Sequence, residues 1–161
     1  MQQNQKASIT GIGSYLPSKV LTNYDLEKMV DTSDDWIIQR TGIKERRIVE
    51  NGQITSDLAT YASLRAMEDA GVSPGDLDMI ITSTITPDHI FPSTSCYIQQ
   101  KIGASRASAF DILAACAGFI YALSVGESFV NSGAMKTVLV VGAECLSKIL
   151  KTRDSFYELG C

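Results

Sequence analysis

Continuously apolar stretches alternate with amphipathic ones along most of this chain. Met79–Ile81 and Val138–Val141 are apolar at every position, which is typical of strands buried on both faces of a parallel sheet. The pattern predicts, in order, strand 7–12, helices 23–30 and 34–41, a polar strand or loop at 44–49, a helix capped by Ser56 and ended by Gly71, strand 78–84, helix 93–102, strand 107–113, helix 116–132 and strand 137–143. Because strand, helix and strand in succession imply right-handed crossovers, we expect an α/β fold with a mostly parallel sheet covered on both faces.

Composition and charge narrow the class of protein. The 161 residues are 45% hydrophobic and 20% charged, which is typical of a globular chain and excludes disorder. A net charge of −4 gives no general attraction to nucleic acid or to anionic membranes. Apolar stretches are far shorter than the ~20 residues of a membrane helix, and the N-terminus lacks the apolar core of a signal peptide. We therefore expect a cytoplasmic protein without nucleic-acid or membrane partners.

Cysteine placement singles out one thiol. Cys96, Cys116, Cys145 and Cys161 show neither a CxxC motif nor zinc-ligand spacing, so we expect no metal site. Cys116 stands where a buried strand is expected to turn abruptly into a long helix. The positive end of the helix dipole favours a thiolate there and lowers its pKa, and nearby backbone N–H groups can meet a developing oxyanion. Cys116 is thus a candidate nucleophile, with a buried structural cysteine as the alternative, whereas Cys96 and Cys145 are expected to fill small core spaces.

Several motifs stand in a consistent order from about residue 8 to about residue 147. They are Gly11-Ile12-Gly13-Ser14-Tyr15-Leu16-Pro17, Thr32-Ser33-Asp34-Asp35-Trp36-Ile37, Arg40-Thr41-Gly42-Ile43, Phe91-Pro92-Ser93, and Ala114-Ala115-Cys116-Ala117-Gly118-Phe119 followed by Tyr121-Ala122-Leu123. Together they resemble β-ketoacyl-acyl carrier protein synthase III, whose nucleophile signature is similar to the last of them. Several independent motifs at consistent spacing make this resemblance specific.

The resemblance implies a fold and a reaction. The fold is the thiolase fold, in which two similar halves form a five-layer α/β/α/β/α arrangement, normally as a homodimer. This chain would be the N-terminal half, one thiolase-like domain over residues 1–161 with a divergent tail at 151–161. Such enzymes start fatty-acid synthesis: acetyl-coenzyme A acylates the cysteine, and malonyl-acyl carrier protein then loses CO2 and condenses to acetoacetyl-acyl carrier protein. No cofactor is implied beyond the coenzyme A thioester that serves as substrate.

The matching motifs also imply roles for individual residues. Thr32, Trp36 and Arg40 match positions that contact coenzyme A, with the indole on adenine and the guanidinium near phosphate. Trp36 and Arg40 are four apart on one helix face, which suits a nucleotide, although a core tryptophan beside a solvated arginine is the alternative. Arg153 matches a second arginine at the adenine, or is a solvated loop residue. Phe91 matches the residue that closes the acyl pocket across the dimer interface and favours a short primer, or is a plain packing anchor.

The remaining candidates carry weaker signals. His89 is the only histidine, and we expect it at a surface or an interface because the catalytic histidine and asparagine of the family lie in its second half. Lys44, Arg46 and Arg47 form a basic cluster that suits an acidic carrier protein, and a solvated strand face explains it equally well.

Three functions are consistent with the sequence. The first is a condensing enzyme whose second half lies outside this chain, and we expect this half alone not to complete condensation. The second is a catalytically incomplete remnant that binds coenzyme A or acts as a scaffold. The third is a related coenzyme A-dependent synthase that acts on a small metabolite.

Overall fold

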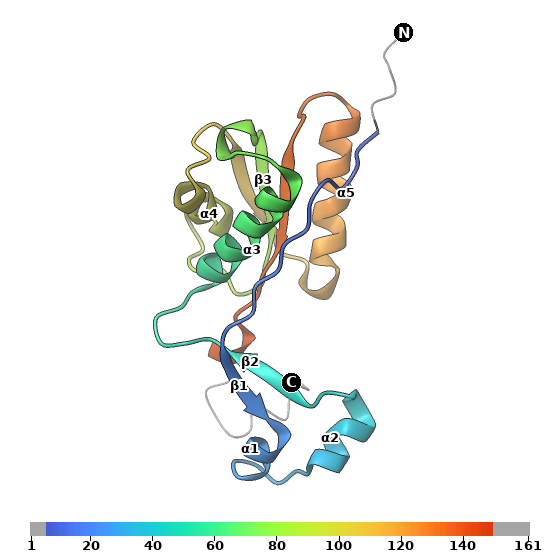
Figure 1. The fold of residues 1–161 in the computed structure, drawn as a ribbon, viewed down its shortest axis with the longest axis vertical. Coiled ribbons are helices and arrows are strands. Elements are labelled where there is room, and N and C mark those ends of the chain that lie inside the picture. The colour runs from blue at the N-terminus through green and yellow to red at the C-terminus, as the bar shows by residue number, and fades with distance from the viewer. Residues whose placement is uncertain (1–5, 150–161) are drawn as a thin grey trace. The chain divides into compact units, whose positions relative to one another are not determined.

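The computed structural model describes residues 6–149, and these form two compact units. The first unit contains residues 6–15 together with Ile54–Glu144, and the second contains Leu16–Gln53 together with residues 145–149. Figure 1 shows the path of the chain through both units. The expectation of one domain over residues 1–161 stays a prediction, and its tail at 151–161 lies outside the described residues.

Three parallel strands form the centre of the first unit. Strand β3 (Met79–Ser83) lies between β4 (Ser108–Ile112) and β5 (Val138–Gly142), and every residue of β3 is buried. Met79 pairs with Ser108 on one side and with Val138 on the other, so the strands run in step. This arrangement confirms the α/β class and the parallel sheet expected from the apolar runs.

Helices cover both faces of this sheet. The helices of the first unit are α3 (Thr55–Ala70), α4 (Thr94–Ile102) and α5 (Gly118–Asn131). Ile80 packs with side chains of α3 and α4 in one apolar cluster, whereas Met79 and Ile81 pack with side chains of α5 in another. Figure 1 shows α3 and α4 on one side of the strands and α5 on the other. The alternation along β3 follows from the two-residue period of a strand.

The strand expected at 7–12 does not form. This segment follows α3 with an irregular backbone, because Gly11 and Gly13 bring it against that helix. A Cβ built at Gly11 would lie 2.5 Å from the carbonyl oxygen of Ala66, closer than atoms can approach. Side chains rather than a neighbouring strand accept its backbone N–H groups: the Ile12 amide donates to Asp69 at 2.9 Å. The strand that the alternating pattern predicted at residues 7–12 is therefore wrong.

The second unit is a small α/β arrangement. Strand β1 (Lys19–Thr22), which the sequence did not indicate, pairs antiparallel with β2 (Glu45–Ile48), which was expected as a polar strand or loop. Helix α1 (Asn23–Glu27) follows the cap Thr22 and is shorter than expected, and α2 (Asp34–Thr41) has the predicted bounds, with Ser33 as cap and Gly42 at its end.

A buried asparagine holds the second unit together. The Asn23 amide nitrogen donates to the Asp34 carboxylate and to the Ile43 carbonyl, both at 2.8 Å, and its oxygen accepts from Arg46 at 2.8 Å. Because Asn23 is fully buried, each of these bonds replaces a lost bond to water. Helix α2, the loop after it and strand β2 are thereby connected to the start of α1.

Short 3₁₀ turns complete the described elements, at Pro74–Asp76, Ala115–Ala117 and Leu146–Lys148. The turn at Ala115–Ala117 includes the first two residues of the helix expected at 116–132, and α5 itself starts at Gly118. Helix α3 starts one residue before the expected cap Ser56, because the Asp57 carboxylate accepts the Ile54 N–H at 3.0 Å and closes the first turn. Within residues 6–149, no helix has the length and apolar character that crossing a membrane requires.

Asp78 ties the start of β3 to the start of β5. One of its carboxylate oxygens accepts the backbone N–H groups of Lys136 at 2.7 Å and of Thr137 at 3.0 Å. These two bonds, to Lys136 first, hold the pKa of Asp78 below its ordinary value of 3.8. A carboxyl group with a lowered pKa stabilises the fold at pH values above the unfolded pKa, and this contribution is lost as the pH falls through the folded pKa.

We predict that Asp78→Ala lowers the free energy of unfolding at pH 7 by about 1.5–2 kcal/mol, the low end of the range for hydrogen bonds to a charged group, because the site is only partly buried. The difference from the unaltered chain should shrink as the pH is lowered below about 4. Urea denaturation of both proteins from pH 7 to pH 3 measures it. A difference that stays constant over this range would show that the charge of Asp78 contributes nothing.

Candidate functional site

Cys116 lies in the connection between β4 and α5. The strand ends at Ile112, the 3₁₀ turn spans Ala115–Ala117, and α5 begins at Gly118, two residues after the cysteine. Cys116 is exposed and forms no disulfide. The strand, turn and helix predicted around it are therefore present, with the thiol in the turn and not in the helix. Its role as a nucleophile stays a prediction at this point.

The backbone next to Cys116 is strained. Ala115 has φ of +46°, and it is the one non-glycine residue with positive φ among residues 6–149. A side chain in this left-handed region costs about 1–3 kcal/mol and persists only where the surrounding structure imposes it. The strained residue stands immediately before the thiol-bearing Cys116.

Glycine residues let α5 approach the sheet closely. A Cβ built at Gly118 would overlap the Oγ of Ser83 at the end of β3, and one built at Gly126 would lie 3.2 Å from Val140 on β5. From the strand side, Gly142 leaves room for the ring of Phe119. The first turn of α5, two residues from Cys116, is thus seated on the ends of β3 and β5.

Phe91 stands in the loop between β3 and α4. Its side chain is 87% exposed, and its neighbour Ile90 is fully exposed. The base of the loop is held firmly, because the Glu144 carboxylate after β5 accepts the Ile85 N–H at 3.0 Å and the Thr86 hydroxyl at 2.8 Å. The structure therefore presents two large apolar side chains on an anchored loop.

In the second unit, Trp36 and Arg40 lie together on α2. The Arg40 guanidinium carbon is 4.7 Å from the centroid of the Trp36 ring, and the Trp36 side chain is 45% exposed. Thr32 is partly buried just before the cap Ser33. The shared helix face expected from their spacing is present, and its exposure removes the alternative of a core tryptophan. Arg153 lies outside the described residues.

The lone histidine, the two other described cysteines and the basic cluster are the remaining candidates from the sequence. His89 is exposed, and its ring centroid is 5.6 Å from that of Tyr97. Cys145 is buried, as expected of a core residue, whereas Cys96 is partly exposed and accepts a hydrogen bond from Ser93 at 3.2 Å. In the basic cluster, Arg46 is bonded to Asn23, and Arg47 to Glu45 and the Pro17 carbonyl, so these two arginines serve contacts inside the unit.

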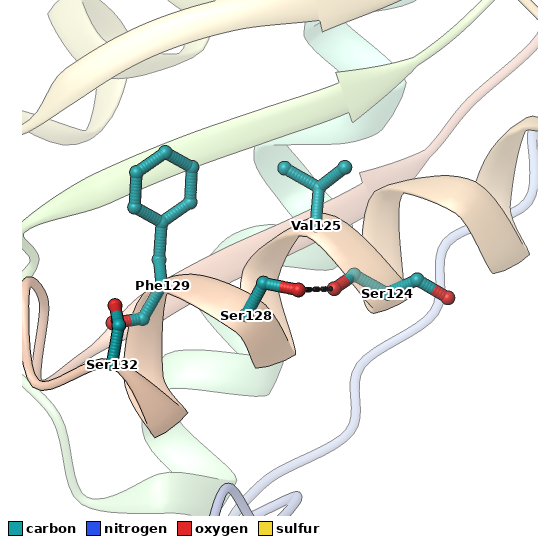
Figure 2. Close-up of a pocket in the computed structure, with 5 residues that line it drawn as sticks. All are labelled: Ser124, Val125, Ser128, Phe129 and Ser132. Atoms are coloured by element: carbon teal, nitrogen blue, oxygen red, sulfur yellow. Dashed lines mark hydrogen bonds between the residues drawn. The ribbon is translucent and has the colours of Figure 1, made fainter.

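Helix α5 carries a shallow pocket on one face, shown in Figure 2 and lined by Ser124, Val125, Ser128, Phe129 and Ser132. Val125 and Phe129 point in the same direction from the helix. The Ser128 hydroxyl donates to the Ser124 carbonyl of its own helix at 2.8 Å. The pocket thus holds hydroxyls already bonded to the backbone and contains no group with reactive chemistry.

Comparison with known proteins assigns the chain to a family. Residues 110–159, which include Cys116, match the family model of 3-oxoacyl-[acyl-carrier-protein] synthase III. Over 148 residues the chain is 62% identical to β-ketoacyl-[acyl-carrier-protein] synthase III of Caldanaerobacter subterraneus subsp. tengcongensis. The aligned region covers 92% of this chain and 45% of that protein. The chain belongs to the β-ketoacyl-acyl carrier protein synthase III family. It spans about half the length of the curated relatives it matches.

Solved structures of synthase III enzymes share its fold. The enzyme of Aquifex aeolicus VF5 superposes with a TM-score of 0.85 at 56% identity, over 87% of this chain and 45% of that one. The enzyme of Pseudomonas aeruginosa PAO1 superposes with a TM-score of 0.88 at 34% identity, over 96% of this chain and 48% of that one. These likenesses confirm the thiolase-like fold, of which this chain matches about one half.

Sequence reasoning missed three residues that hold the segments after the strands in place. Asp111 accepts backbone N–H groups at the start of α4, Glu144 accepts the Ile85 N–H at the base of the loop that carries Phe91, and Ser83 meets Gly118 of α5. An acidic residue at the end of a buried strand was an available signal, because such a carboxylate needs a partner. Nothing in the local pattern pointed to the strained φ of Ala115.

The seat of α5 gives a direct test. We predict that Gly118→Ala destabilises the chain by about 1–3 kcal/mol, because the added methyl group overlaps Ser83 and overpacks the joint. Urea denaturation measures the change. Gly75→Ala is the matched control, since a Cβ there meets nothing within 4 Å, and it should change stability by no more than about 0.5 kcal/mol. Equal effects of the two substitutions would contradict a tight joint at Gly118.

Proposed function

We propose that this chain supplies the acyl-accepting part of a condensing enzyme that starts fatty-acid synthesis, with Cys116 as the nucleophile. The observation that carries the proposal is the exposed thiol of Cys116 in the turn between a partly buried parallel strand, β4, and the long helix α5. The membership of the chain in the synthase III family supports it, as does the family-model match over the cysteine itself.

The proposed reaction has two covalent steps. The Cys116 thiolate attacks the thioester carbonyl of acetyl-coenzyme A, a new carbon–sulfur bond forms, and coenzyme A leaves as its thiolate and takes up a proton. Malonyl-acyl carrier protein then loses CO2, and the electron pair of the broken carbon–carbon bond forms an enolate. The enolate attacks the acetyl-cysteine carbonyl, and acetoacetyl-acyl carrier protein leaves while the Cys116 thiolate is restored. One difficult carbon–carbon bond formation is thereby divided into an acyl transfer and a condensation.

The turn suits the first of these steps. Small residues surround the thiol in the chain, which leaves space for a thioester, and α5 begins two residues later, so that the positive end of its dipole lies next to the turn. A positive dipole end stabilises the negative oxygen of a tetrahedral intermediate. The strained Ala115 keeps Cys116 in the turn and out of the regular helix.

The other candidates have complementary roles in the proposal. Trp36 and Arg40 bind the nucleotide of coenzyme A, the ring by stacking and the guanidinium by pairing with phosphate, and Thr32 and Arg153 assist them. Phe91 closes an acyl pocket and favours a short primer, a role that its exposure on an anchored loop allows if it reaches a second copy in a homodimer. We place the protein in the cytoplasm, with malonyl-acyl carrier protein as its second substrate and no cofactor.

Acylation tests the proposal. We predict that acetyl-coenzyme A labels Cys116 faster than Cys96 or Cys145 in the folded chain, because of the three cysteines that the structure describes Cys116 is the one that combines exposure with a position before a helix. Peptide mapping by mass spectrometry after timed incubation measures the three rates. Labelling of the urea-unfolded chain is the control, since there the three thiols should react alike. Equal labelling of the three thiols in the folded chain would overturn the assignment of Cys116 as nucleophile.

Coenzyme A binding tests the nucleotide site separately. We predict that Trp36→Ala weakens binding by about tenfold, the low end of the ~1–3 kcal/mol that an aromatic ring contributes by stacking on a base. Arg40→Ala should weaken it as well. Calorimetric titration measures both, and Arg65→Ala is the matched control because Arg65 also lies over a ring, that of Tyr15, in the first unit. Unchanged affinity in both α2 variants would place the ligand elsewhere.

A further inference from the structure

Asp111 bridges β4 and α4 through both of its carboxylate oxygens. One oxygen accepts the Thr94 N–H at 2.6 Å, and the other accepts the Ser95 N–H at 2.8 Å. Thr94 and Ser95 are the first two residues of α4 and are fully buried. Their N–H groups have no partner within the helix, so the carboxylate takes the place of water there. The Ser95 hydroxyl adds a 2.7 Å bond to the Phe110 carbonyl of β4.

This bridge stands close to the turn that holds Cys116. Asp111 is the penultimate residue of β4, and the strained Ala115 follows four residues later. On the far side of the turn, Gly118 is seated against Ser83. The turn is therefore held at both ends, by hydrogen bonds to α4 before it and by close packing on β3 after it. Positive φ at Ala115 requires such constraint, because a free chain would relax to negative φ.

We propose that Asp111 is a positioning residue for Cys116: its bridge to Thr94 and Ser95 fixes the end of β4 and thereby keeps Ala115 strained and the thiol in its place before α5. This inference rests on the proposed function of Cys116. It assigns to Asp111 no contact with substrate. Its effect on chemistry passes through the backbone from residue 111 to residue 116.

Asp78 offers a matched control in the same sheet. It too is a partly buried aspartate whose carboxylate accepts two consecutive backbone N–H groups and joins two segments of the first unit. It stands before the first residue of β3, however, whereas Asp111 stands near the last residue of β4. Since the strands are parallel and in step, Asp78 lies at the amino ends of the strands and Asp111 lies at their carboxyl ends. Loss of Asp78 therefore weakens the fold without touching the turn.

The experiment compares the rate of alkylation of Cys116 by iodoacetamide in four proteins: the unaltered 161-residue chain, Asp111→Ala, Asp78→Ala and Thr94→Pro. Peptide mapping by mass spectrometry gives the rate, and urea denaturation gives the stability of each protein. Thr94→Pro removes one N–H of the bridge while keeping the helix, because proline is well tolerated at the first helical position and Ser93 before it is already extended.

We expect both Asp111→Ala and Thr94→Pro to slow alkylation of Cys116 by about tenfold, since small displacements of a reacting group can cost up to about a hundredfold. Asp78→Ala should lower stability and leave the rate within about twofold, because the two sites are distant and independent. A rate that is unchanged in Thr94→Pro, or that falls equally in Asp78→Ala, would overturn the positioning role. If Asp111→Ala does not fold, Thr94→Pro alone decides.

Failure of this inference is distinguishable from failure of the proposed function. The positioning role is judged by the rate at which iodoacetamide alkylates Cys116 in each variant, divided by the rate in the unaltered chain. The proposed function is judged by the labelling of Cys116 against Cys96 and Cys145 by acetyl-coenzyme A in the unaltered chain. If Cys116 is labelled faster than the other two cysteines but its alkylation rate does not change in the Asp111 and Thr94 variants, only the positioning role of Asp111 is contradicted.

Discussion

The parallel register of β3 with β4 and β5 decides where the candidate groups of the first unit lie. Because the strands run in step, their carboxyl ends meet at one edge of the sheet. From that edge β3 continues into the loop that carries Phe91, β4 continues into the turn that carries Cys116, and β5 continues to Glu144. Three segments distant in the sequence are thus brought to one edge by hydrogen bonds that involve no functional side chain.

Carboxylates then hold these segments in place. Asp111 accepts N–H groups at the start of α4, Asp88 accepts the Ser56 N–H at the start of α3, and Glu144 accepts the Ile85 N–H. A charged acceptor bonded to backbone donors is stronger than a neutral pair, and at a helix N-terminus it also meets the positive end of the dipole. Several acidic residues of the chain therefore stabilise the first unit, in addition to contributing to the net charge.

Close packing supplies the second constraint on the turn. Gly118 and Gly126, which have no side chain of their own, allow α5 to pack directly on side chains of β3 and β5, and this contact leaves little room for the turn before it to relax. The strain at Ala115 is stored where packing on one side and hydrogen bonds on the other meet. Strain of this kind is common where a reactive side chain must be held out of regular structure. The reactivity proposed for Cys116 therefore depends on the packing after the turn and on the hydrogen bonds before it, as well as on the cysteine itself.

The sequence by itself determined the class of fold, most of its elements and the family. The apolar runs of β3 and β5, the caps Ser33 and Gly42, and the spacing of Trp36 and Arg40 are local patterns, and local patterns survive in a single sequence. Only the tertiary structure decided that residues 7–12 follow α3 instead of joining a sheet, that the turn at Cys116 is strained, and that Asp111 bridges to Thr94 and Ser95. These features depend on contacts between segments far apart in the chain, and the hydrophobic pattern of either segment alone contains no record of its partner.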